Sequence, residues 1–109
     1  MRIISQDGTS DVPYERYSVC VTRDEYDNIY HIICNNNEKT YRILAEYSTK
    51  AKATKAMEML RKAYENNEFY HHTSPTDVFK DVASLLSNEE FNKLTSEYFQ
   101  FPQDDEIEV

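Results

Sequence analysis

The chain has 109 residues, which is enough for one domain with a single hydrophobic core and too few for two. Hydrophobic residues make up 39% and charged residues 29% of the sequence, a composition typical of a folded domain. The 20 acidic and 12 basic residues give a net charge of −8. This charge argues against a general nucleic-acid-binding protein, because neutralising phosphates requires a basic surface.

The sequence carries no sign of a membrane segment. No apolar run approaches the ~20 residues that a membrane-spanning helix needs. The opening segment, 1–6, is too short an apolar stretch for a secretory signal. We therefore expect a cytoplasmic protein, in which Cys20 and Cys34 are thiols rather than a disulfide.

The N-terminal segment has the pattern of a hairpin. Asp7-Gly8 lies between two short segments of strand-like composition, 2–5 and 11–14, and Asp-Gly is a strong turn signal. Pro13 cannot donate a ladder hydrogen bond, so the returning strand is expected at a sheet edge. The chain has only one glycine, and its other turns must rely on Asn, Asp and Ser.

Residues 16–47 have the pattern of a three-stranded meander. Alternating segments rich in β-branched and aromatic residues are separated by two polar stretches, 24–28 and 35–39. The expected strands span 17–22, 29–34 and 40–47.

The spacing then changes to that of a helix. Apolar residues recur every three or four positions from Ala53 to Tyr64, and Ser48 or Thr49 can cap the N-terminus. We expect this helix to end at Asn66-Asn67. Its other face is rich in Lys and Arg and is typical of a solvated surface.

Two shorter helices and an acidic end are expected after it. Ser74-Pro75 and Ser87-Asn88-Glu89-Glu90 both have the pattern of a helix start, the latter as a capping box. Residues 102–109 lack any helical or strand period and are acidic, so we expect a C-terminal tail outside a single domain of residues 1–101. The predicted fold class is α+β: a mostly antiparallel sheet, formed by the N-terminal hairpin and the meander, is covered by the long helix, with two further helices beside it.

The sequence contains none of the common enzyme signatures. One glycine excludes a Gly-rich phosphate-binding loop, and no Ser or Cys lies in a nucleophile motif. Acidic pairs such as Asp104-Asp105 are adjacent in sequence and do not face each other as a catalytic pair would. We therefore expect a protein that is not an enzyme.

Zinc is the one cofactor that the sequence suggests. If the five residues 24–28 form the first meander loop, Cys20 and Cys34 lie on the same face of the sheet as diagonal neighbours. His71 and His72 follow the long helix, where the chain can return over that sheet. Two thiolates and imidazoles make a tetrahedral zinc site. In the alternative reading, both cysteines are small buried hydrophobes and both histidines lie on the surface.

The acidic residues suggest a surface for a protein partner. They gather in the loop 24–28 and near the C-terminus, where no basic residue follows Lys93. Such a surface is complementary to a basic groove that would otherwise hold nucleic acid, and a neighbouring aromatic side chain can anchor the contact. The alternative is that the acids serve solubility alone. The candidate partner-binding residues are Asp24, Glu25, Asp27, Phe101, Asp104, Asp105 and Glu106.

Several segments resemble a known protein family. The strings MRIISQDG, DVPYE, AEYSTKAKATKAMEMLRKAY and FQFPQDDEIEV are similar to those of small proteins from Gram-positive bacteria and their prophages. The segments 16–37 and 66–97 are not part of this resemblance, which carries no binding residues with it. It implies a mobile genetic element as the setting. Small acidic phage proteins without enzyme motifs are similar in type to anti-CRISPR inhibitors, at least one of which contains zinc.

The preferred hypothesis is a monomeric inhibitory protein that acts in the host cytoplasm. Its partner would be the RNA-guided nuclease of type II CRISPR immunity, specifically type II-A, whose heteroduplex lies in a positively charged channel. Binding there would block loading of target DNA, without direct contact with nucleic acid or membrane. Two alternatives stay open: a regulatory or scaffold module of the mobile element, and a metal-dependent factor or minor enzyme.

Overall fold

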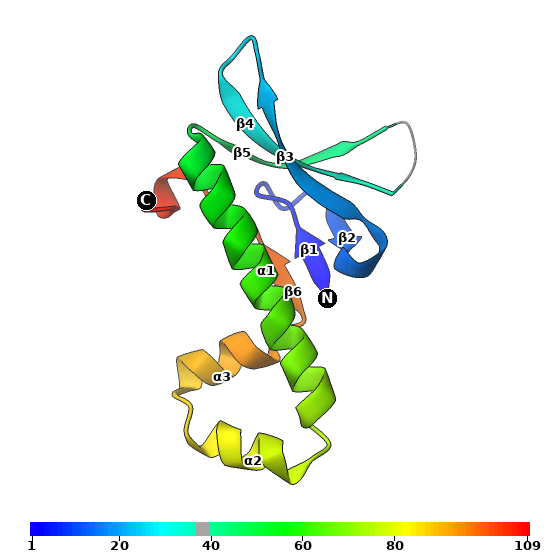
Figure 1. The fold of residues 1–109 in the computed structure, drawn as a ribbon, viewed down its shortest axis with the longest axis vertical. Coiled ribbons are helices and arrows are strands. Elements are labelled where there is room, and N and C mark those ends of the chain that lie inside the picture. Colours follow the sequence, from blue (N-terminus) through cyan, green and yellow to red (C-terminus); the bar gives the residue numbers. More distant parts are fainter. Residues whose placement is uncertain (37–39) are drawn as a thin grey trace.

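The computed structural model describes residues 1–36 and 40–109 and confirms the α+β fold class (Figure 1). Residues 37–39 of the expected second meander loop lie outside this description. The strands are β1 (Arg2–Ile4), β2 (Asp11–Pro13), β3 (Ser18–Asp24), β4 (Ile29–Asn35), β5 (Arg42–Tyr47) and β6 (Tyr98–Gln100). The helices are α1 (Lys50–Thr73), α2 (Asp77–Ser84) and α3 (Asn88–Thr95), with short 3-10 helices η1 (Tyr14–Arg16) and η2 (Asp104–Glu106).

The first sheet joins the two ends of the chain. Strands β1 and β2 form the expected antiparallel hairpin, and Gly8 takes a positive φ of 77° in its turn. The Asp7 carboxylate accepts hydrogen bonds from the Ser5 hydroxyl and from Thr9, which lowers its pKa to about 2. Strand β6 then pairs with β1 in parallel, giving the order β2-β1-β6. Strand β6 has no counterpart among the strands expected from the sequence.

The second sheet is the expected meander, β3-β4-β5, but its register differs from the expectation by one residue. Asp24 pairs with Ile29, so four residues rather than five connect β3 to β4. Asp24 closes this tighter loop: its carboxylate accepts the Tyr26 N–H at 2.9 Å, and its carbonyl accepts the Asn28 N–H at 3.0 Å. Asn28 takes a φ of 54°, a conformation that asparagine tolerates better than most residues.

Helix α1 forms the core together with both sheets. Its predicted apolar stripe is confirmed, with Ala53, Ala56 and Leu60 fully buried, and Thr49 is the N-cap that accepts the Lys52 N–H. The other core residues come from the strands β1, β2, β4 and β5 and from the C-terminal segment: Ile3, Val12, Ile32, Cys34, Leu44, Ala45, Tyr47, Phe101 and Ile107.

The end of α1 at Asn66-Asn67 was predicted wrongly, because the helix continues to Thr73. Asn67 is buried inside it, and its side-chain amide donates to the carbonyl oxygen of Ser96 at 3.0 Å. A contact between distant segments therefore satisfies an asparagine that, by its local preference, would end a helix.

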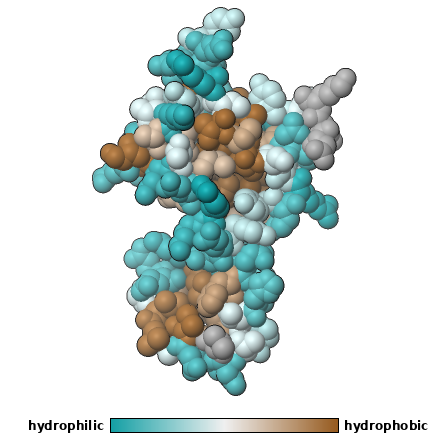
Figure 2. Space-filling view, in the orientation of Figure 1, coloured by the Kyte–Doolittle hydropathy of each residue, from teal (hydrophilic) through white to brown (hydrophobic). Residues whose placement is uncertain are grey.

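Helices α2 and α3 lie at the far end of α1, away from the meander, and the molecule extends 53 Å along its longest axis (Figure 1). The Ser87–Glu90 capping box is confirmed. Helix α2 starts at Asp77 rather than after Ser74, because Ser74 still donates to the Tyr70 carbonyl as the C-cap of α1. Figure 2 shows apolar side chains gathered on this end of the molecule, where Leu85 is 85% exposed.

The segment 102–109, expected as a tail outside the domain, packs against it instead. Ile107 is buried in the core, and the Tyr47 hydroxyl donates to the Pro102 carbonyl at 2.7 Å. One apolar residue, Ile107, and a few polar contacts hold this segment against the domain. Its sequence therefore shows no repeating pattern of apolar residues. Within the described residues, no helix has both the length and the apolar character that crossing a membrane requires.

Candidate functional site

The last residue of β3 and the four residues that connect it to β4, together residues 24–28, form an exposed acidic turn that we call the acidic hairpin tip. Tyr26 lies at its centre with 98% of its surface exposed. The neighbouring Glu25 and Asp27 side chains are also exposed. In Figure 1 this hairpin projects beyond the rest of the sheet at the top of the view. An aromatic ring is thus presented to solvent between two carboxylates.

The tip is held in one shape by its own hydrogen bonds. In addition to the two bonds that close the loop, the Asp24 carboxylate accepts the Asp27 N–H at 3.4 Å. The Arg23 guanidinium donates to the Asn28 side-chain oxygen at 2.7 Å. Asp24 is therefore used within the loop, whereas the three residues that follow it are free to contact a partner. Tyr26 was missing from the sequence-based candidates, although its position among three loop acids was a usable signal.

The C-terminal acids differ in the contacts they make within the fold. Asp104 accepts hydrogen bonds from the Ser48 N–H at 2.8 Å, from the Ser48 hydroxyl and from the Lys52 ammonium. The Ser48 N–H, followed by the hydroxyl and Lys52, lowers the Asp104 pKa. Asp104 therefore fixes the chain just before α1. Asp105 and Glu106 are exposed, and Glu106 accepts the Gln103 N–H at 2.8 Å.

Phe101 is not available as an interface anchor. It is only 1% exposed, and its ring meets that of Phe99 edge to face at 5.2 Å between centroids. The expectation that it would anchor a partner is wrong, because the parallel pairing of β6 with β1 carries the following residue into the core.

The observed register of β3 on β4 also separates the two cysteines that were expected to bind zinc together. Cys20 pairs with Ile33 and Cys34 pairs with Val19, so the two cysteines lie on opposite faces of the sheet. Cys20 is exposed, whereas Cys34 is buried, and burial raises the pKa of its thiol. The geometric premise for a shared zinc site was therefore wrong.

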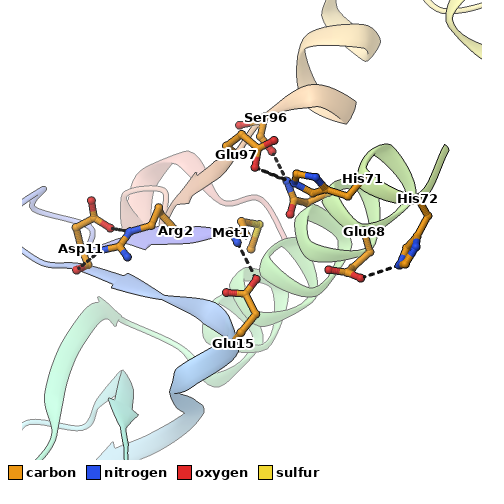
Figure 3. A network of polar contacts seen from close by, with 10 residues as sticks. Met1, Arg2, Asp11, Glu15, Glu68, His71, His72, Ser96 and Glu97 are labelled. Atoms are coloured by element: carbon orange, nitrogen blue, oxygen red, sulfur yellow. Dashed lines mark hydrogen bonds and ion pairs between the residues drawn. The ribbon is translucent and has the colours of Figure 1, made fainter. Parts of the chain in front are cut away.

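The two histidines of the expected site have carboxylate partners instead (Figure 3). His71 Nε2 lies 3.0 Å from a Glu97 oxygen, and His72 Nε2 lies 3.3 Å from a Glu68 oxygen. Hydrogen bonds from His71 and then Asn67 lower the pKa of Glu97. Across residues 1–36 and 40–109, no group of three or more Cys, His, Asp or Glu side chains is placed to hold a metal ion.

The same close-up shows that the charges near the N-terminus are paired. The N-terminal amine of Met1 lies 2.7 Å from a Glu15 oxygen, and Arg2 Nε lies 2.7 Å from an Asp11 oxygen (Figure 3). These ion pairs join the start of the chain to β2 and η1. Their charges are used within the fold, so we take the acidic hairpin tip as the candidate site for binding a partner. No protein-family model, curated protein or solved structure matches the chain.

Proposed function

We propose that this protein is a non-catalytic inhibitor that binds a basic surface of another protein through the acidic hairpin tip. The observation that carries the proposal is the 98% exposure of Tyr26 between Glu25 and Asp27. Tyrosine is among the residues that most often dominate the energy of protein interfaces, because its ring buries a large area at a low cost in conformational entropy.

The hydrogen bonds of the tip support this role. A loop that is already fixed in its binding shape loses little conformational entropy on association, and that raises affinity. The carboxylates of Glu25 and Asp27 add attraction to a basic partner, and the net charge of −8 speeds the encounter. Ring and carboxylates thus have separate tasks: the ring provides buried area, and the carboxylates provide orientation.

The partner that we favour is the RNA-guided nuclease of type II CRISPR immunity, in the cytoplasm of a bacterial host. Its positively charged channel for the heteroduplex has the chemistry that an acidic hairpin would fit. The resemblance of the chain ends to prophage proteins supports the same setting. Occupying the channel would keep target DNA from loading, with no chemical step and no cofactor.

The test is cleavage of a matched DNA target by purified type II nucleases, with this protein added in molar excess before the DNA. We expect inhibition by the native protein and a loss of about 30-fold or more in inhibitory potency for Tyr26→Ala, as for an interface hot spot. Tyr41→Ala is the matched control, because Tyr41 is also exposed, at 60%, but lies just before β5.

Two results would contradict the proposal in different ways. Undiminished cleavage by several type II nucleases would exclude this class of partner and favour a regulatory or scaffold role. If Tyr26→Ala and Tyr41→Ala inhibit the nuclease equally well, the nuclease remains the partner, but the hairpin tip is not the surface that binds it.

A further inference from the structure

A second surface lies between α1 and α3, far from the hairpin tip. It is a groove of about 920 Å³ that is lined by one face of α1, by α3 and by β6. Its apolar floor includes Met59, which is 38% exposed, together with Ala63, Tyr98 and Phe99. In Figure 1, α3 lies beside the lower half of α1.

The groove has the length of a short helix. A smaller hollow of about 490 Å³ shares Lys55 and Glu58 with it and continues along α1 to Lys50. At ~1.5 Å per residue, the stretch of α1 from Lys50 to Asn66 spans ~24 Å. The two hollows together therefore follow α1 over a length that suits the docking of a short amphipathic helix.

Among the described residues, the unpaired charges beside the floor are basic on balance, with the two lysines Lys55 and Lys62 against the one carboxylate of Glu58. Lys55 and Lys62 have no ion pair within the part of the chain that the structure describes, and they are seven positions apart on α1, a distance of ~10 Å. Lys93, on the opposite wall, lies 3.5 Å from Glu89. Glu58 lies between the two unpaired lysines. A partner helix would match them with acidic residues one heptad apart, on the flanks of an apolar stripe.

We infer that this groove binds an acidic amphipathic helix of a partner protein, with the apolar stripe on Met59 and Ala63 and the acids toward Lys55 and Lys62. The inference does not depend on the nuclease proposed above. The overall charge favours the opposite result, because a chain of net −8 attracts a basic peptide more than an acidic one. Binding of an acidic helix would therefore require a specific site.

The test uses the full chain and three labelled synthetic peptides of 18 residues, measured by fluorescence anisotropy at physiological ionic strength. The acidic probe has leucines on one helical face and glutamates on its flanks. The basic probe replaces those glutamates with lysines, and the third probe is a scrambled acidic sequence with no apolar face. We expect the acidic probe to bind at least about tenfold more tightly than either of the others.

Charge reversal then locates the site. Lys55→Glu combined with Lys62→Glu should weaken the acidic probe about tenfold, equivalent to about 1.4 kcal/mol. Arg16→Glu combined with Lys80→Glu is the matched control: it changes the net charge equally, and both residues are exposed outside the groove. The control should weaken the probe much less. Carbon-13 spectra should show the methyl signals of Met59 and Ala63 shifting on titration.

Each contrary result overturns the inference. Binding of the basic or the scrambled probe with equal or greater affinity would show that the groove does not select acidic helices. An equal loss in the two double variants would show attraction by overall charge alone. Sedimentation that reveals a dimer disrupted by the Lys55 and Lys62 changes would make a second copy of this chain the occupant.

Discussion

The Tyr47 hydroxyl, at the end of β5, donates a hydrogen bond of 2.7 Å to the carbonyl oxygen of Pro102, across 55 positions of sequence. Tyr47 is almost completely buried. Burial, followed by the nearby charges of Asp104 and Glu106, raises the pKa of its phenol, so the hydroxyl stays protonated as a donor. The C-terminal segment therefore closes the fold beside the start of α1, and it makes the acidic end of the chain part of the domain.

The first prediction concerns the stability of this closure. Ile107→Ala should lower the free energy of unfolding by about 2 kcal/mol, the low end for truncating a buried isoleucine, because Ile107 lies near the surface of the core. Val109→Ala is the control, since Val109 is 74% exposed and its truncation should cost less than about 0.5 kcal/mol. Urea denaturation measures both, and equal effects would mean that residues 102–109 do not dock in solution.

The second prediction is a dependence of stability on pH through Asp104. Its pKa is lowered below the ordinary value of 3.8 by the Ser48 N–H, the Ser48 hydroxyl and Lys52. A carboxyl with a lowered folded-state pKa stabilises the fold above its unfolded pKa, and this contribution is lost as the pH falls through the folded pKa. Asp104→Asn should therefore reduce the melting temperature at pH 7 and make progressively less difference below about pH 4.

Asp105→Asn provides the comparison for Asp104, because Asp105 is exposed and has no hydrogen bond to Ser48 or Lys52 among the described contacts. It should leave the melting temperature nearly unchanged at both pH values. A constant difference between the native protein and Asp104→Asn from pH 7 to pH 3 would contradict the proposed role of the ionised carboxylate.

The third prediction tests the predicted stripe of α1. Leu60 is buried at its centre, so Leu60→Ala should cost about 2–5 kcal/mol of unfolding free energy. The adjacent Met59 faces the groove, and Met59→Ala should cost no more than about 1 kcal/mol. Chemical denaturation of both variants would reveal a rotated helix if the larger loss occurred at Met59.

The fourth prediction concerns the attachment of α3 to α1. Asn67→Ala removes a buried amide that donates to the part-buried carbonyl of Ser96 and to the Glu97 carboxylate, which should cost about 1–3 kcal/mol. His71→Ala removes an exposed pair with Glu97 and a tilted ring contact with Tyr70, and should cost less than about 1 kcal/mol. Hydrogen exchange should also accelerate in α2 and α3 for the asparagine variant. Unchanged exchange there would indicate that other contacts hold these helices.

Local signals were the part of the fold that the sequence could predict. Gly8 marks the first turn, the spacing from Ala53 to Leu60 marks the buried face of α1, and Ser87 caps α3. Each depends only on neighbours a few positions away, so a single sequence contains the relevant information.

The errors share a different cause, which is contact between distant segments. The pairing of β6 with β1 and the burial of Asn67 against Ser96 depend on residues that no local pattern connects. The register of β3 on β4 depended on one loop residue, and a shift of one residue reverses the face of every side chain relative to its partner strand. The groove between α1 and α3 was missed for the same reason, since two helices build it together.

The fifth prediction tests that register directly through the two thiols. Cys20 is exposed, whereas Cys34 is buried and has a raised thiol pKa, so a thiol reagent at pH 8 should modify one cysteine rapidly and the other only on unfolding. Cys20→Ser should remove the rapid phase, and Cys34→Ser should leave it intact. Adding equimolar zinc should protect neither cysteine, because the two lie on opposite faces of the sheet. Equal rates for the two thiols, or joint protection by zinc, would restore the original register and the shared metal site.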